Sequence, residues 1–129
     1  AQDGFMQVDF DTLLGTSDIV SIHAPLNEYT EGLMNEEAFQ KMKSSAILIN
    51  VGRGPIVNEK ALADALNHGE ISAAGLDVLS EEPMRADNPL KQVRDQEKLL
   101  ITPHMAWATK EARTRVLTLM AGHIKDYFS

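Results

Sequence analysis

The sequence predicts an α/β fold built on a mainly parallel β-sheet. Short apolar runs at residues 18–23, 46–51 and 71–78 alternate with helical patterns at residues 35–43 and 58–68. This alternation is typical of parallel strands joined by crossover helices. Glycine, proline and asparagine residues stand at the ends of the runs, where such a fold needs its turns.

The first two expected strands are bounded by turn residues. The run at 18–23 lies between Gly15 and Pro25, which mark its two ends. The run at 46–51 is almost entirely apolar and ends at Gly52. An unbroken apolar run of this length predicts a strand buried on both faces, as in a parallel sheet.

The later part of the chain contains two more expected strands. The run at 71–78 carries the small residues Ala73, Ala74 and Gly75, which predict close packing against a helix. A polar loop over about residues 80–96 then leads to a short apolar strand at 99–101.

Capping residues indicate where the helices begin and end. Asn35 and Asn58 are expected N-caps, and Gly69 is expected to end the helix that starts after Asn58. The longest helix is predicted over about residues 109–128. Its apolar stripe, at helical spacing, consists of Ala112, Val116, Leu119, Met120 and Tyr127.

Composition excludes several classes of protein. The chain has 129 residues, which suits a single core, and a formal net charge of −7, which disfavours nucleic acid and anionic membranes as partners. It contains no run long enough for a transmembrane helix, and no signal-peptide pattern. The absence of cysteine excludes disulfides, cysteine-ligated metal and a thiol nucleophile. We therefore expect a cytoplasmic protein that binds neither nucleic acid nor membrane.

Ligands of open α/β sheets gather at the carboxyl ends of the strands, so these ends are the first places to inspect. Ala24 and Pro25 follow the first strand and either bring the backbone close to a flat ligand or simply end the strand. Arg53, between Gly52 and Gly54, follows the second strand. An arginine fixed there suits forked hydrogen bonding to a carboxylate, although bonding to nearby carbonyls is an equal alternative.

The last strand ends at a histidine, and acidic residues precede it in the sequence. His104 can donate and accept a proton near neutral pH, and its position at a strand end distinguishes it from the other histidines. Asp77, near the end of the third strand, can accept a hydrogen bond from a carboxamide. Glu81 or Glu82 can bond to His104, although acidic residues in loops are usually just solvated.

Four segments follow one another in a fixed order along the chain. Each is common alone, but the ordered set is specific: Asp18-Ile19-Val20 with His23-Ala24-Pro25-Leu26, Asn50-Val51-Gly52-Arg53-Gly54 with Val57, Leu76-Asp77-Val78 with Glu82-Pro83, and Pro103-His104. The set resembles the second half of the D-isomer-specific 2-hydroxyacid dehydrogenases, and the match extends from Phe10 to the final helix.

The resemblance implies a partial Rossmann-like, doubly wound parallel sheet with a C-terminal helix. It also implies hydride transfer between a nicotinamide cofactor, NAD with NADP as the alternative, and a small 2-oxo or 2-hydroxy acid. Arg53 would hold the substrate carboxylate, His104 would be the acid/base group, Glu82 would keep His104 protonated, and Asp77 would bind the nicotinamide carboxamide. The resemblance requires no metal. The other residues that would line the cofactor are Ala24, Pro25, Val51, Gly52, Arg53, His104 and Ala106.

One departure from the family pattern bears on the substrate. The family often has glycine where Ala106 stands, and here Trp107 follows it. The resulting His-Met-Ala-Trp segment resembles the glycerate dehydrogenase (hydroxypyruvate reductase) branch. Hydroxypyruvate or glyoxylate is therefore the expected substrate.

A second departure is length, because family members are more than twice as long. No glycine-rich dinucleotide fingerprint or acidic ribose-binding residue is present. We expect a partial chain: residues 1–108 as the second half of the NAD(P)-binding domain, and residues 109–129 as a helix that packs on a missing substrate domain. The partial chain would be inactive, bind dinucleotide weakly and self-associate through its unpaired stripe. The full-length protein would be a homodimer.

Two alternatives follow from the same resemblance. Transcriptional corepressors of this fold keep a similar Arg, Glu and His set and act mainly through partners, so a non-catalytic, dinucleotide-sensing binding protein is the main alternative. Formate dehydrogenase is also similar, but it has glutamine where Glu82 stands. The His-Met-Ala-Trp segment favours a 2-hydroxyacid dehydrogenase over the non-catalytic binding protein.

Overall fold

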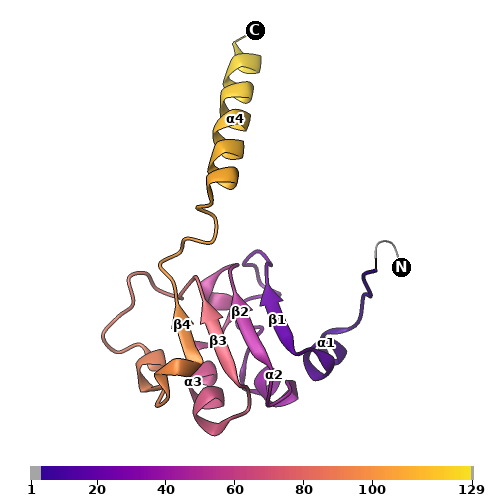
Figure 1. The fold of residues 1–129 in the computed structure, drawn as a ribbon, viewed down its shortest axis with the longest axis vertical. Helices are drawn as coiled ribbons and strands as arrows, with labels where there is room; N and C mark the ends of the chain where they lie inside the picture. Colours follow the sequence, from indigo (N-terminus) through magenta and orange to yellow (C-terminus); the bar gives the residue numbers. More distant parts are fainter. Residues whose placement is uncertain (1–3, 129) are drawn as a thin grey trace.

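The computed structural model describes residues 4–128 and contains one sheet of four strands (Figure 1). In the order in which they pair, these are β1 (Ile19–Ile22), β2 (Ile47–Asn50), β3 (Ala73–Leu76) and β4 (Leu99–Ile101). All three pairings are parallel. The predicted α/β fold with a parallel sheet is therefore confirmed.

The register brings the carboxyl ends of the strands level with one another. Asn50, the last residue of β2, pairs with both Ile22 and Leu76, and Leu76 pairs with Ile101. The segments that follow the four strands therefore emerge side by side at one edge of the sheet.

Four α-helices accompany the sheet: α1 (Phe10–Thr16), α2 (Glu36–Lys41), α3 (Glu59–His68) and α4 (Lys110–Tyr127). The two predicted asparagine caps are present, since Asn35 accepts from the backbone N–H of Ala38 and Asn58 from that of Ala61, both at 3.0 Å. Gly69 ends α3 in the left-handed conformation, as predicted.

The short helix α1 was not predicted from the sequence. Asp9 caps it by accepting a hydrogen bond of 2.9 Å from the backbone N–H of Thr12. Leu14 is its one buried residue. A helix of this length with a single buried position shows no apolar periodicity, which is why only its cap could have revealed it.

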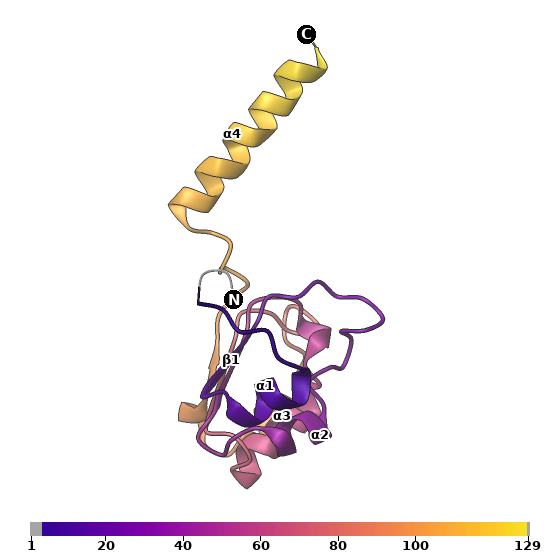
Figure 2. The same ribbon diagram turned by 90° about the vertical axis from the view of Figure 1, so that its right-hand side faces the viewer.

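The first three helices cover one face of the sheet, as the edge-on view shows (Figure 2). The core lies between this face and the helices, and its fully buried side chains include Leu48 of β2, Phe39 of α2 and Leu62 of α3. Along each of the first three strands, alternate residues are buried. The helices therefore bury every second residue of these three strands, whereas none of the residues of β4 is buried.

The opposite face of the sheet carries no helix within residues 4–128. Two expectations are therefore wrong for this part of the chain. The second strand is not buried on both faces, because Ile47 is exposed and Ile49 only half-buried. The expected packing of the small residues against a helix fails at Gly75, on which a Cβ atom would meet nothing within 4 Å, although Ala74 is buried in the core.

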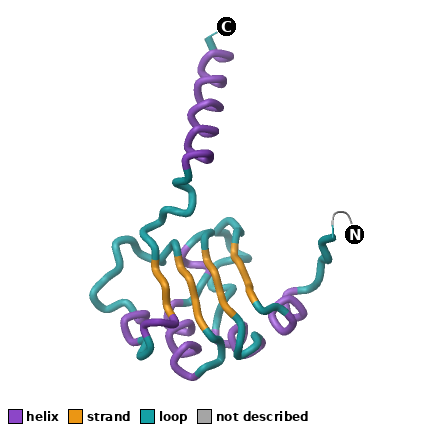
Figure 3. Tube along the Cα trace, viewed as in Figure 1, coloured by secondary structure: helices purple, strands orange, loops and turns teal. Residues whose placement is uncertain are grey.

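Helix α4 projects away from the carboxyl edge of the sheet (Figures 1 and 3). None of its residues is buried, and its large apolar side chains are at least half exposed. The stripe predicted from the sequence is therefore unpaired here. No helix within the described residues is long and apolar enough to cross a membrane.

An exposed apolar stripe predicts association of the 129-residue chain with itself. Replacing both Leu119 and Met120, near the centre of the stripe, by lysine should shift the chain toward the monomer in analytical ultracentrifugation. The matched control is the double lysine variant at Thr114 and Thr118, on the polar side of the same helix. If both variants associate like the original chain, the bare sheet face and not α4 causes the association.

Candidate active site

Three adjoining hollows follow the carboxyl edge of the sheet. The first, about 520 Å³, lies after β1 and β2, the second, about 270 Å³, after β2 and β3, and the third, about 530 Å³, after β3 and β4. Val51 lines the first two, and Asp77 and Thr102 line the last two. Neighbouring hollows thus share lining residues at the strand ends, which is the position predicted from the sequence, and the three hollows together are called the cleft below.

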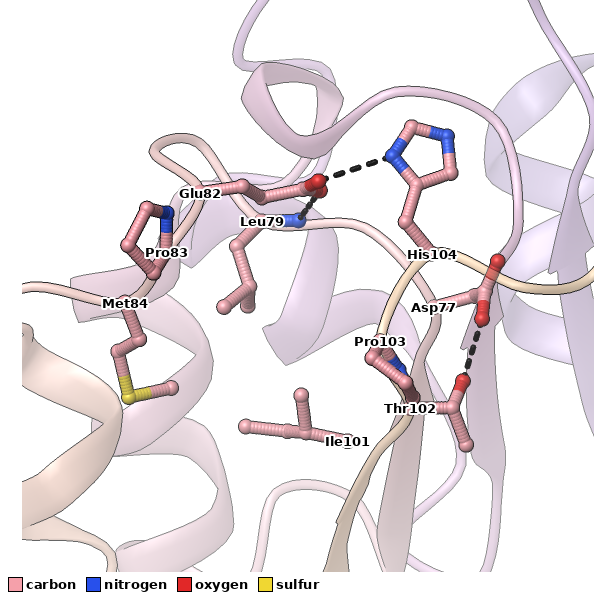
Figure 4. Close-up of a pocket in the computed structure, with 9 residues that line it drawn as sticks. All are labelled: Asp77, Leu79, Glu82, Pro83, Met84, Ile101, Thr102, Pro103 and His104. Atoms are coloured by element: carbon pink, nitrogen blue, oxygen red, sulfur yellow. Dashed lines mark hydrogen bonds and ion pairs between the residues drawn. The ribbon is translucent and has the colours of Figure 1, made fainter.

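Glu82 and His104 form a carboxylate–imidazole pair in this cleft (Figure 4). Glu82 Oε2 lies 2.9 Å from His104 Nδ1, and Glu82 Oε1 accepts a hydrogen bond of 2.9 Å from the backbone N–H of Leu79. The Leu79 bond, followed by the His104 bond, lowers the pKa of Glu82 below its usual value. The carboxylate is therefore ionised at neutral pH, and Nε2 of His104 points away from it (Figure 4).

Asp77 lies directly behind His104 and is almost completely buried. Its Oδ1 accepts hydrogen bonds from the hydroxyl of Thr102 and from the backbone N–H of Met105, at 2.9 Å. Its Oδ2 accepts one from the backbone N–H of Ala106, at 2.8 Å. Burial raises the pKa of Asp77, but these three hydrogen bonds outweigh it, so the pKa lies below the usual value.

Asn50 has the same function for the turn that follows β2. It is fully buried, its Oδ1 accepts from the backbone N–H of Gly52 and its Nδ2 donates to the carbonyl of Arg53, both at 3.0 Å. The backbone N–H of Asp77 in turn donates to the carbonyl of Asn50 at 2.9 Å. The two buried polar residues thus hold neighbouring turns.

Arg53 lines the first hollow together with His23. Arg53 Nη1 donates to the carbonyl of Gly52 at 2.8 Å. Bonding to a nearby carbonyl was one of the two alternatives for Arg53 in the sequence. A guanidinium has five N–H donors, so donors remain for a ligand. His23 Nε2 lies 2.9 Å from the hydroxyl of Ser21.

The Gly52-Arg53-Gly54 segment is in contact with two other loops. A Cβ atom on Gly54 would lie 1.9 Å from the carbonyl oxygen of Leu79, and one on Gly52 would lie 2.9 Å from that of Ala24. The glycines therefore permit close approach of the protein's own backbone, whereas the sequence suggested positive φ or close approach of a ligand.

The predicted site residues are distributed over the whole cleft. The first hollow is lined by Ala24, Pro25, Val51, Gly52 and Arg53, the second by Val51, Asp77 and Ala106, and the third by Asp77, Glu82 and His104. Arg53 and His104 line different hollows. Sequence reasoning overlooked Asn50 and Thr102, although a polar residue ending an apolar run was a usable signal for Asn50.

Comparison with known proteins gives a consistent result. The family model described as "D-isomer specific 2-hydroxyacid dehydrogenase, NAD binding domain" matches residues 1–106. The chain is 43% identical over 120 residues to a hydroxypyruvate reductase of Blautia hydrogenotrophica, a match that covers 93% of this chain and 36% of the relative. The chain thus spans about a third of the length of this relative.

Two solved structures share the arrangement described above. An acyclic imino acid reductase in complex with NADPH and D-Arg has a TM-score of 0.86 and 35% identity, covering 99% of this chain and 40% of the other. A D-lactate dehydrogenase of Aquifex aeolicus, complexed with NAD and lactic acid, has a TM-score of 0.81 and 31% identity, with coverages of 94% and 40%. The first likeness includes α4.

The contact between Gly54 and Leu79 predicts the effect of a methyl group. Gly54→Ala should lower the free energy of unfolding by about 1–3 kcal/mol, because backbone atoms must move to admit the new Cβ. The matched control, Gly75→Ala, meets no atom within 4 Å and should change the stability by less than about 0.5 kcal/mol. Urea denaturation of the two variants measures the difference. Equal stabilities would contradict the contact.

Proposed function

Because this chain belongs to the D-isomer-specific 2-hydroxyacid dehydrogenase family, we propose that the intact protein reduces a small 2-oxo acid with a nicotinamide cofactor. The observation that carries the proposal is the contact of 2.9 Å between Glu82 and His104. It places an ionised carboxylate on one nitrogen of an imidazole whose other nitrogen points away (Figure 4). This is the arrangement that a general acid needs.

Reduction of a carbonyl requires a proton for its oxygen and a positive group for the carboxylate of the substrate. His104 donates the proton from Nε2. Glu82 stabilises the positively charged imidazolium from which this proton leaves. Arg53 binds the carboxylate with the N–H donors that its bond to Gly52 leaves over. In the oxidative direction, His104 accepts the proton of the hydroxyl group.

The cleft has features that fit a nicotinamide cofactor, which would supply the hydride. A carboxylate has about four acceptor positions, and the three hydrogen bonds of Asp77 leave one of them, on Oδ2. That position can accept an N–H of the carboxamide. Backbone at Ala24, Val51 and Gly52 lines the neighbouring hollow. Relatives of known structure bind NAD or NADPH.

For the substrate we propose hydroxypyruvate or glyoxylate. The similar protein of Blautia hydrogenotrophica is named a hydroxypyruvate reductase, and other relatives are named glyoxylate/hydroxypyruvate reductase B. Trp107 supports this choice because the His-Met-Ala-Trp segment resembles the glycerate dehydrogenase branch. The indole N–H of Trp107 donates to the carbonyl of His104 at 2.8 Å. The His-Met-Ala-Trp segment and the relatives named as reductases favour an enzyme over a corepressor-like binding protein.

For the domain arrangement we propose that residues 1–108 complete an NAD(P)-binding domain and that α4 packs on a substrate domain. The exposed stripe of α4 supports this assignment, as does the likeness over 99% of the chain to a relative more than twice as long. A homodimer in the cytoplasm remains our expectation for the intact protein, on the family resemblance and the composition.

The Glu82–His104 pair predicts the pH dependence of the reductive reaction. The lowered pKa of Glu82 keeps its carboxylate ionised from pH 5 to 9, so it stabilises the imidazolium throughout this range. Glu82→Gln removes the charge and should move the basic limb of kcat/KM for hydroxypyruvate to lower pH, with less effect at low pH. His104→Ala should lower kcat by about a hundred- to ten-thousand-fold.

The matched control is Glu81→Gln, which makes the same change in the neighbouring acid, whose carboxylate bonds to Arg85 instead. All four intact proteins are measured with NADH across pH 5 to 9. A basic limb that stays in place in Glu82→Gln would show that Glu82 is a solvated loop acid. Lack of any reductase activity in the unsubstituted protein would refute the proposed function itself.

A lysine in place of Arg53 tests the carboxylate site. Arg53→Lys keeps the charge but replaces a planar fork by a point charge, so kcat/KM for hydroxypyruvate should fall severely, by roughly a hundredfold. Lys91→Arg, on the surface near α3, serves as a control for exchange between these residue types. Retention of most of the kcat/KM in Arg53→Lys would show that another group binds the carboxylate.

A further inference from the structure

Thr102 is a site residue with no role in the function proposed above. We infer that Thr102 and Asp77 form a clamp that fixes the turn at residues 102–106, and that Thr102 is thereby a positioning residue for proton transfer by His104. This inference rests on the proposed function for its effect on catalysis, but the clamp itself is a property of the folded chain.

The clamp closes a short loop around His104. The Thr102 hydroxyl before it and the N–H groups of Met105 and Ala106 after it all donate to the same carboxylate. The backbone N–H of Thr102 also donates to the carbonyl of Leu76 at 2.9 Å, which anchors the loop to β3. His104 therefore lies on a turn that is tied at both ends to one buried side chain.

The turn requires such a clamp because its backbone is in an uncommon conformation. His104 has a φ of 53° and is the one non-glycine residue with positive φ among residues 4–128. This left-handed conformation is unfavourable for a residue other than glycine, and it persists only where the surroundings impose it. Three hydrogen bonds to a buried carboxylate are able to impose it.

Thr102 is the member of the clamp that a substitution can remove without affecting the other two. Its side chain is half-buried, and valine has nearly the same shape but lacks the hydroxyl. Without that donor, Asp77 keeps its charge and its two backbone partners but loses the bond that ties it to the end of β4. The expected result is a looser turn and a misplaced Nε2, with the chemistry of His104 and Glu82 unchanged.

This position in the structure predicts which kinetic constant changes. Thr102→Val in the intact protein should lower kcat for hydroxypyruvate at least tenfold, because a small displacement of the acid impairs proton transfer. KM for NADH should change less than twofold, since the acceptor position of Asp77 that faces the cofactor is retained. The basic limb of the pH profile should stay in place, in contrast to Glu82→Gln, because Glu82 is unchanged.

The first part of the experiment uses the 129-residue chain and requires no activity. In NMR spectra of the unsubstituted chain, the amide signals of Met105 and Ala106 should titrate together, with the pKa of Asp77, below pH 3.8. They should also show slow hydrogen exchange. Thr102→Val should raise the exchange rates at least tenfold, and Thr102→Ser, which keeps the hydroxyl, should restore them. Unchanged rates in Thr102→Val would overturn the clamp.

The second part measures kcat and KM in the intact protein for the same two variants. The control is Thr16→Val, which makes the same change at a hydroxyl that bonds only to the carbonyl of Thr12 in α1. A tenfold loss of kcat in Thr102→Val, rescue by Thr102→Ser and no effect of Thr16→Val support the inference. A rise in KM for NADH with kcat retained would overturn the positioning role. If the unsubstituted protein is inactive, the proposed function fails, and the NMR result still decides whether the clamp exists.

Discussion

The burial of two polar side chains at the carboxyl edge of the sheet determines the shape of the whole site. A buried amide or carboxylate is costly unless it is hydrogen-bonded, so the chain around it must supply partners. Asn50 obtains them from the turn after β2, and Asp77 obtains them from the turn after β4. The loops that carry Arg53 and His104 therefore follow courses that satisfy these two residues, and the bond from the backbone N–H of Asp77 to the carbonyl of Asn50 connects them.

The sequence was sufficient for the strands, the two asparagine-capped helices and, through the family resemblance, the Glu82–His104 pair, because each has a local or motif-level signal. Apolar runs bounded by turn residues locate strands, and an asparagine before an amphipathic segment locates a helix start. Thr102 could not be recognised in this way, since its importance depends on Asp77, a residue distant in the sequence. The two site glycines carried a misleading signal, because their partner is the protein's backbone and not a ligand.

The open face of the sheet was also beyond the reach of sequence patterns. An apolar run such as Ile47-Leu48-Ile49 predicts that both faces of a strand are covered, but it does not identify the segment that covers each face. In residues 4–128 the helices cover one face only, so Ile47 and Leu100 are exposed. The apolar stripe of α4 has the same origin. Both surfaces expose apolar side chains, which fits the proposal that this chain packs against further protein.

The carboxyl edge separates two tasks that a dehydrogenase site must combine. Residues that exchange protons or bind charge, such as Glu82 and His104, remain partly exposed and reach into the cleft. Residues that fix them, such as Asn50 and Asp77, are buried and are bonded to the backbone on both sides. Since a displacement of about 1 Å can cost a hundredfold in rate, the proposed function requires the buried residues to hold the exposed ones in place. The buried residues thus hold the turns below the cleft, the titratable groups lie at its surface, and the hydrogen bonds of Asp77 connect the two.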